Sequence, residues 1–281
     1  MGYNGAVPRV FLTKRAEFPV AHQYQHPLWD REKNEEVFGQ AMRLHGHNYL
    51  VEVTIGGEVE PRTGMVLNLS DLKRAVLSML EAFDHKNLNE DSPHFVGLIP
   101  TTERLTSILW GLLEPRLTGL TRIRLYESPG LFVDYSKDHE RHPVIAALTT
   151  LTRVYRFSSA HRLFSPAFTD EENRAIYGKC SSLHGHGHDY TLEVTLAWPP
   201  EQPMIPRWAA IEMDPLVAAQ VAAAFDHRHL NHDVEEFRRL VPTAENILIV
   251  TWERLVKRLP PGLLNRLKLV ETRDNTFEYY G

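Results

Sequence analysis

An internal repeat constrains the fold of this chain more than any other feature of its sequence. Five motifs occur twice in the same order: FPVAH at 18–22 and FSSAH at 157–161, HGHNYLVEVTI at 45–55 and HGHDYTLEVTL at 186–196, FDHKNLN at 83–89 and FDHRHLN at 225–231, PTTERL at 100–105 and PTAENI at 242–247, and YES at 126–128 and VET at 270–272. The two copies of each motif keep nearly the same separation. This pattern indicates a tandem duplication.

The duplication predicts two like domains, 1–140 and 148–281, with the mixed-charge segment SKDHERHP at 136–143 near their junction. In each half, two segments of period-2 alternation precede two helical segments and a closing strand pair. Such a ββααββ unit is an α+β domain, with an antiparallel sheet and helices on one face. Ser70 and Asp214 are the expected N-caps of the first helix in the two halves.

Composition excludes several classes of protein. The formal charge of -5 argues against general affinity for nucleic acid or for anionic membranes. No apolar run approaches the roughly 20 residues of a membrane helix, and the N-terminus lacks a secretory pattern. Because Cys180 is the only cysteine, no internal disulfide is possible and a cytoplasmic location is expected.

Histidine is unusually frequent, at 15 residues, and both halves contain a His-x-His motif. These motifs are His45 with His47 and His186 with His188. In a strand, His-x-His places both imidazoles on one face, and three imidazoles with an open position are typical of catalytic zinc. Two candidates for the third ligand occur in both halves: His22 with His161, and His85 with His227. His184 has no counterpart in the first half, so we expect it to support the site rather than to bind the metal.

Cys180 has three possible roles: a fourth zinc ligand, a buried structural residue, or a reactive thiol. The first half keeps its histidines but has Ala41 at the matching position, where FGQA aligns with YGKC. A residue missing from one of two otherwise intact sites is a poor candidate for an essential ligand. Since a cation and imidazoles lower the pKa of a nearby thiol, we interpret Cys180 as a nucleophile or base.

An aspartate precedes a histidine in both FDH motifs, at Asp84-His85 and at Asp226-His227. A carboxylate near an imidazole fixes its tautomer and raises its basicity. Because the side chains of adjacent residues rarely bond each other, we expect each pair to act through a third group. The alternative is that the aspartate merely ends a helix.

Two further pairs of glutamates recur in the two halves. Glu127 and Glu271 lie in otherwise apolar strands, where a buried carboxylate needs a partner, such as a ligand ring with N–H donors. Glu103 and Glu245 lie in the first turn of a helix, where the helix dipole alone explains a carboxylate.

These residues resemble the 6-pyruvoyltetrahydropterin synthase family, which includes the bacterial 6-carboxytetrahydropterin synthases. The matching segments are FSSAHRLFSP, DEENRAIYGKC and HGHDY in the second half, and TGMVLNLSDLK, FDHKNLN and PTTERL in the first. The resemblance covers nearly the whole chain, with one family unit in each half. It implies a tunnelling fold, in which ββααββ units close a barrel through oligomerisation.

The resemblance also implies roles for individual residues. The implied zinc ligands are His161, His186 and His188, with His22, His45 and His47 as first-half counterparts. The implied catalytic residues are the thiolate of Cys180 and a relay of Asp226 and His227 from a neighbouring unit, with Asp84 and His85 as counterparts. The implied substrate-binding residues are Glu271, Glu245 and Thr243, with Glu127 and Glu103 as counterparts.

The reaction that the resemblance implies converts 7,8-dihydroneopterin triphosphate to 6-pyruvoyltetrahydropterin and eliminates triphosphate, with zinc as cofactor. The five residues between Cys180 and His186 favour this product over 6-carboxytetrahydropterin, the alternative product in deazapurine synthesis. A non-catalytic pterin- or zinc-binding protein is a third interpretation, against which the intact Cys180, Asp226 and His227 argue.

The two halves have lost different family features. The first lacks the cysteine, for which the resemblance implies Glu35 or Glu36 as an alternative base, and the second has Val217 where Lys73 stands. These complementary losses favour composite sites between unlike units of a homo-oligomer. Because the family barrel contains three units and two barrels stack, three chains would supply the six units.

Overall fold

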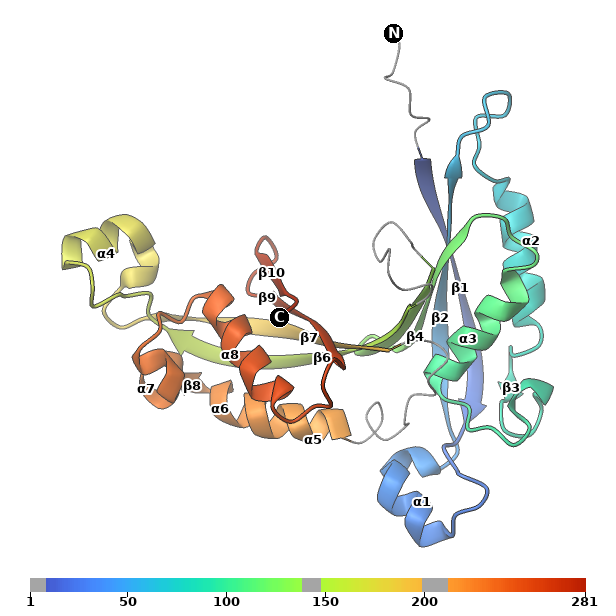
Figure 1. The fold of residues 1–281 in the computed structure, drawn as a ribbon, viewed down its shortest axis with the longest axis horizontal. Helices are drawn as coiled ribbons and strands as arrows, with labels where there is room; N and C mark the ends of the chain where they lie inside the picture. Colours follow the sequence, from blue (N-terminus) through green and yellow to red (C-terminus); the bar gives the residue numbers. More distant parts are fainter. Residues whose placement is uncertain (1–8, 138–147, 199–211) are drawn as a thin grey trace. The chain divides into compact units, whose positions relative to one another are not determined.

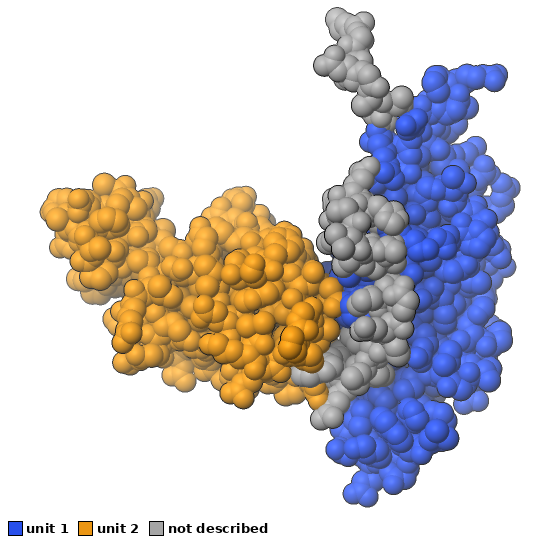
Figure 2. Space-filling model, in the orientation of Figure 1, with its two compact units in different colours: residues 1–151, 198–211 blue, residues 152–197, 212–281 orange. Residues whose placement is uncertain are grey.

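The computed structural model describes residues 9–137, 148–198 and 212–281 (Figure 1). The chain separates into two compact units (Figure 2). Unit 1 comprises residues 1–151 and 198–211, and unit 2 comprises residues 152–197 and 212–281. Most of the segment expected as a linker, 136–143, lies outside the described residues.

Unit 1 contains a mixed sheet with the strand order β5-β4-β2-β1-β3. Its elements are β1 (Arg9–His22), α1 (Arg31–Phe38), η1 (Gly39–Met42), β2 (His45–Glu58), α2 (Leu69–Leu80), β3 (Lys86–Asn87), η2 (Pro93–Phe95), α3 (Thr102–Leu113), β4 (Leu120–Ser128) and β5 (Leu131–Ser136). The four long strands pair antiparallel. The short β3 pairs parallel with β1 and so brings the FDH motif beside the end of β1.

Unit 2 repeats this arrangement with the order β10-β9-β7-β6, and its short β8 pairs parallel with β6. Its elements are β6 (Leu148–His161), α4 (Asp170–Tyr177), η3 (Gly178–Ser181), β7 (His186–Trp198), α5 (Met213–Val217), η5 (Ala218–Ala222), α6 (Ala223–Phe225), β8 (Arg228–His229), α7 (Leu230–Asp233), η6 (Glu235–Arg238), α8 (Ala244–Val256), β9 (Leu264–Val270) and β10 (Thr276–Tyr279). Both units are therefore α+β, as the sequence predicts.

Helices α2 and α3 cover one face of the unit 1 sheet (Figure 1). The hydrophobic core lies between this face of the sheet and the two helices. Leu72, Val76 and Leu80 are buried there because their i, i+4 spacing forms one face of α2. The side chain of Asn68, not of Ser70, caps this helix. In unit 2 the expected cap, Asp214, lies inside α5 instead.

Asp214 fails as a cap because its carboxylate is engaged elsewhere. It forms an ion pair with Arg153 and accepts a hydrogen bond from the Tyr155 hydroxyl at 2.8 Å. Both partners lie on β6, so the carboxylate joins the helix start to the strand. The helix itself begins after Glu212, without a side-chain cap.

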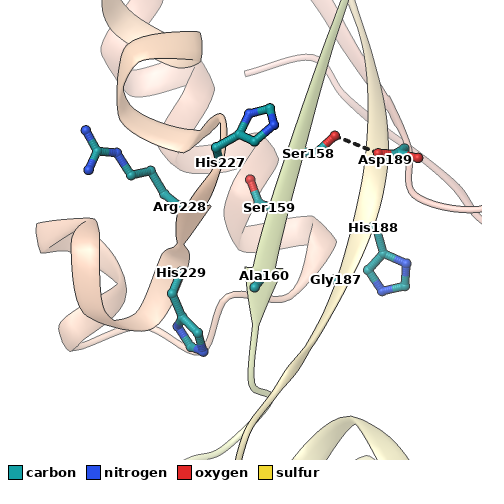
Figure 3. Close-up of a pocket in the computed structure, with 9 residues that line it drawn as sticks. All are labelled: Ser158, Ser159, Ala160, Gly187, His188, Asp189, His227, Arg228 and His229. Carbon is teal, nitrogen blue, oxygen red and sulfur yellow. Dashed lines mark hydrogen bonds between the residues drawn. The ribbon is translucent and has the colours of Figure 1, made fainter.

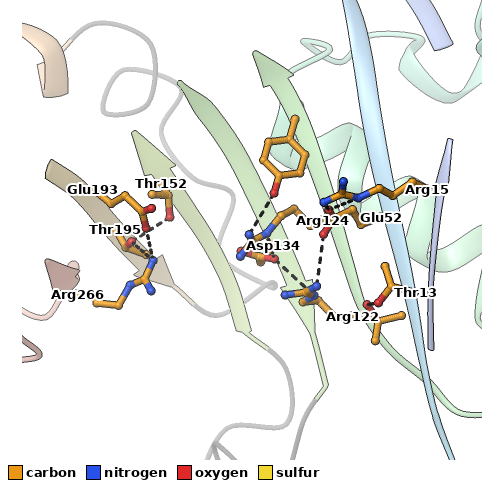
Figure 4. A network of polar contacts seen from close by, with 12 residues as sticks. Thr13, Arg15, Glu52, Arg122, Arg124, Asp134, Thr152, Glu193, Thr195 and Arg266 are labelled. Carbon is orange, nitrogen blue, oxygen red and sulfur yellow. Dashed lines mark hydrogen bonds and ion pairs between the residues drawn. The ribbon is translucent and has the colours of Figure 1, made fainter. Parts of the chain in front are cut away.

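The duplication is visible in matching polar contacts between strands (Figure 4). In unit 1, Thr13 bonds Thr54 at 2.9 Å, and in unit 2 the equivalent hydroxyls of Thr152 and Thr195 bond at 2.9 Å. The ion pairs match as well: Arg122 lies 3.4 Å from Glu52, and Arg266 lies 2.9 Å from Glu193. Such pairs across neighbouring strands fix the register of the sheet.

Helices α1 and α4 were not expected from the hydrophobic pattern, because both are short and mostly polar. A local signal for α4 exists in the sequence. Thr169 and Glu172 form a reciprocal capping box at its N-terminus. Across the described residues, no helix is both long and apolar enough to cross a membrane.

Candidate active site

Three histidines of unit 2 converge where β6 ends and β7 begins. His161, His186 and His188 each offer a ring nitrogen, and these atoms lie within 4.8 Å of one another. The Nδ1 of His161 lies 2.8 Å from the carbonyl oxygen of Pro242. A carbonyl only accepts, so Nδ1 carries the hydrogen and Nε2 presents a lone pair.

The spacing of these nitrogens suits zinc. The Nε2 atoms of His161 and His186 lie 3.2 Å apart. Two ligands of a tetrahedral zinc with Zn–N bonds of about 2.0–2.1 Å lie about 3.3 Å apart. The donor set therefore fits a zinc ion bound by three imidazoles.

Unit 1 contains the same arrangement in His22, His45 and His47, again within 4.8 Å. The antiparallel register places His22 opposite His45, which explains why the third ligand comes from the end of β1. His22 donates through Nδ1 to the carbonyl oxygen of Pro100 at 2.9 Å. The Nε2 atoms of His22 and His47 are buried without a hydrogen-bond partner among the described residues, as expected of atoms placed to bind a metal.

Burial favours the neutral form of four of these imidazoles, those of His22, His47, His161 and His186. It lowers the pKa of His22 and of His161 to about 4, and it also lowers the pKa of His47 and of His186. Neutral imidazole is the form that binds a metal.

A glycine between the two histidines of each motif allows the strands to approach closely. A Cβ atom at Gly187 would lie 2.9 Å from the carbonyl oxygen of Ser159, and one at Gly46 would lie 3.1 Å from that of Val20. Any larger residue would push the two strands apart. The glycines therefore help the three imidazoles to converge.

The alternative candidates for the third ligand, His85 and His227, lie outside both groups. His184 is exposed in the turn before β7 and also lies outside the unit 2 group. The strand register thus selects His186 and His188 within the HGHGH run.

Cys180 lies in η3 and is half-buried. Its carbonyl accepts a hydrogen bond from the backbone N–H of Leu163 at 2.9 Å, and Ala41 accepts the equivalent bond from Tyr24 at 2.8 Å. Cys180 and Ala41 therefore occupy equivalent positions. The thiol lies outside the group of histidine ligand atoms.

Glu271 follows β9 and faces His188, with 3.8 Å between Oε1 and the imidazole Nε2. The Tyr190 hydroxyl donates to the same carboxylate at 3.5 Å. Burial raises the pKa of Tyr190, and the charges of Glu271 and Cys180 add to this effect. The carboxylate and the histidines thus form one site, and the Cys180 thiol lies close enough for its charge to act on Tyr190.

The two FDH motifs correct one expectation, because each aspartate bonds the adjacent histidine directly. His85 Nδ1 lies 2.9 Å from Asp84, and His227 Nδ1 lies 3.0 Å from Asp226. Positive φ angles of 57° and 55° at the two histidines make this local contact possible. Such a left-handed conformation is costly for a residue with a Cβ atom.

The Asp226–His227 pair lies at the edge of the unit 2 sheet. Asp226 accepts a hydrogen bond from the backbone N–H of Ser158 at 2.9 Å, and this bond lowers the pKa of its carboxyl. The His227 side chain is 83% exposed. The imidazole is thus held in place but open to another molecule.

A hollow of about 530 Å³ lies beside His227, and Figure 3 shows the residues that line it. His227 and His229 lie on the segment beside β6, and His188 and Asp189 lie on β7. In unit 1 a hollow of about 770 Å³ is bordered by His47, His85 and Glu127.

The remaining candidates lie near the starts of α3 and α8. Thr243 caps α8, and Glu245 in its first turn is exposed. The equivalent Glu103 is buried, and burial raises its pKa. Glu35 and Glu36 lie on the exposed side of α1.

Comparisons with known proteins give a consistent result. Residues 11–138 and 150–281 each match the family described as 6-pyruvoyl tetrahydropterin synthase. The chain is similar to the 6-pyruvoyl tetrahydrobiopterin synthases of Drosophila melanogaster (38% identical over 136 residues, 46% of this chain and 80% of the relative) and Homo sapiens (35% over 133 residues, 47% and 90%). A putative 6-carboxy-5,6,7,8-tetrahydropterin synthase of Archaeoglobus fulgidus is 37% identical over 86 residues, 31% of this chain and 70% of that protein. The solved structure of Caenorhabditis elegans 6-pyruvoyl tetrahydropterin synthase matches with a TM-score of 0.42 and 30% identity over 44% of this chain and 91% of that one.

Proposed function

Because the chain belongs to the 6-pyruvoyl tetrahydropterin synthase family, as two tandem copies of the family unit, we propose that it converts 7,8-dihydroneopterin triphosphate to 6-pyruvoyltetrahydropterin and eliminates triphosphate at unit 2. One observation carries the choice of unit. Unit 2 combines a three-histidine group with the thiol of Cys180 and the carboxylate of Glu271, whereas unit 1 has Ala41 at the place of the thiol.

His161, His186 and His188 would hold a zinc ion, since all three offer a nitrogen within 4.8 Å of the others. A bound zinc ion polarises a substrate oxygen and acidifies the neighbouring C–H protons. The hydrogen bond from His161 to Pro242 fixes the tautomer that this binding needs.

Cys180 would remove a proton from the substrate side chain, because a thiolate is a usable base when cationic groups lie nearby. Glu271 would accept hydrogen bonds from the N–H groups of the pterin ring. Glu245 and Thr243 would border the ring from the start of α8.

The Asp226–His227 pair would move protons at a site of a neighbouring unit, since its imidazole is exposed at a sheet edge. This role requires that the sheet edge of one unit lies beside the site of another. A tunnelling fold, in which sheet edges pair between units and close a barrel, would place them so. We propose three chains, and so six units, in a cytoplasmic homo-oligomer.

The decisive experiment compares the wild type with Cys180→Ala. Purified protein is incubated with 7,8-dihydroneopterin triphosphate, triphosphate release is followed, and the pterin product is identified by mass. We expect Cys180→Ala to abolish release while zinc content is unchanged. Loss of zinc together with activity would show that the thiol is a ligand, and a product with the mass of 6-carboxytetrahydropterin would favour the alternative reaction.

A further inference from the structure

Glu127 and Glu271 are equivalent carboxylates in very similar surroundings. Each side chain is 14% exposed, and each faces a histidine of its metal group, at 3.7 Å in unit 1 and 3.8 Å in unit 2. Access from solvent therefore does not distinguish the two sites.

The hydrogen bonds to the two carboxylates do distinguish them. The Oε2 atom of Glu127 accepts from the Tyr49 hydroxyl at 3.4 Å, from the Tyr24 hydroxyl at 3.5 Å, and from the Thr102 hydroxyl, while Oε1 faces His47. Among the described residues, Glu271 accepts only from Tyr190, the counterpart of Tyr49. The carboxylate of unit 1 thus has two more internal donors than that of unit 2.

Two differences between the repeats create this contrast. Leu163 stands at the place of Tyr24, and Ala244 stands at the place of Thr102. Neither leucine nor alanine has a hydroxyl group, so these two side chains cannot donate a hydrogen bond to Glu271.

Tyr24 is also held firmly in this position. Its ring is 7% exposed and forms a small apolar cluster with Phe38 and Ile99, against which Ala41 packs. The ring of Tyr24 meets that of His22 edge-on at 5.1 Å between centroids. The Tyr24 phenol therefore contacts both His22 of the metal group and Glu127 as part of the folded unit.

We propose that unit 1 is a metal-binding site closed to pterin, because the hydroxyls of Tyr24 and Thr102 occupy Glu127 in place of the ring N–H groups. This inference rests on the proposed pterin chemistry of unit 2. It leaves the metal group of unit 1 intact, since the buried Nε2 atoms of His22 and His47 accept or donate no hydrogen bond among the described residues. Each hydrogen bond to a charged group contributes roughly a factor of ten or more in affinity, so displacing two of them should weaken pterin binding about 100-fold.

The test counts bound pterin and bound zinc per chain. The full-length, zinc-loaded protein is titrated with neopterin by equilibrium dialysis, and zinc is measured in the same samples. We expect two zinc ions but one tightly bound neopterin per chain in the wild type. The variant Tyr24→Leu/Thr102→Ala, which gives unit 1 the residues of unit 2, should bind two.

The reverse variant is the matched control. Leu163→Tyr/Ala244→Thr should weaken neopterin binding at unit 2 about 100-fold while both zinc ions stay bound, and it tests the idea even if the first variant misfolds. Two tight neopterins on the wild type, or a single one on a folded Tyr24→Leu/Thr102→Ala variant with two zinc ions, would overturn the inference and leave the proposed function standing. No neopterin on the wild type would overturn the proposed function and this inference with it.

Discussion

The buried histidine of each metal group makes the stability of the metal-free protein depend on pH. His22 and His161 have pKa values lowered to about 4 by burial, from 6.5. Above pH 7 the imidazole is neutral in both the folded and the unfolded chain. Between pH 6.5 and 4 the unfolded chain takes up a proton that the buried imidazole does not, so the free energy of unfolding falls as the pH falls.

The size of this effect follows from the shift. For each of the two histidines, the free energy of unfolding of its unit should be about 2 kcal/mol lower at pH 5 than at pH 8, and about 3 kcal/mol lower below pH 4. The assay is urea unfolding of the chelator-treated protein at both pH values, comparing the wild type with His161→Asn. The loss of stability on acidification should be about 2 kcal/mol smaller in the variant, because the buried imidazole is gone. The variant His184→Asn, which removes an exposed imidazole, is the control. If the wild type, His161→Asn and His184→Asn all lose the same stability on acidification, the argument is refuted.

Three further predictions concern the metal and the relay. Metal analysis of the purified protein should give two zinc ions per chain, and a ratio near one would mean that unit 1 does not hold its ion. If unlike units form the composite sites, Asp84→Ala/His85→Ala should abolish triphosphate release, whereas loss of activity in Asp226→Ala/His227→Ala alone would assign the relay to a like unit. If the relay comes from a like unit, His227→Gly should lose activity. In either arrangement this variant should match or exceed the wild type in thermal unfolding, since glycine relieves the left-handed backbone at φ 55°; a large fall in Tm would show that the imidazole supports the fold.

The sequence alone was sufficient for those features that depend on periodicity and repetition. The duplication, the α+β class and the pairing of His186 with His188 all follow from strand alternation and matched motifs. His161 was one of two candidates for the third ligand, and the family resemblance favoured it over His227. Other details do not follow from the sequence. Asp214 was expected to cap a helix, but Arg153 and Tyr155 on the neighbouring strand take its carboxylate, and a contact between residues so distant in the chain leaves no local pattern.

The direct bond between Asp226 and His227 was also missed, because it depends on a positive φ that local propensity disfavours for histidine. The hydroxyls of Tyr24 and Thr102 stand where the second repeat has Leu163 and Ala244, and a repeat pattern identifies residues that the copies share, not residues that differ. Their hydrogen bonds to Glu127 also join segments distant in the chain, which no local pattern predicts.

The glycine within each His-x-His motif has a consequence for the choice of metal ion. Because a Cβ atom at Gly187 would lie 2.9 Å from the Ser159 carbonyl oxygen, any side chain at this position would separate the two strands and, with them, the imidazoles of His161 and His188. The close spacing that glycine allows suits a small cation that accepts nitrogen ligands, whereas calcium prefers oxygen ligands at 2.3–2.6 Å. A residue that offers no ligand atom thus helps to determine which metal ion the three histidines would bind.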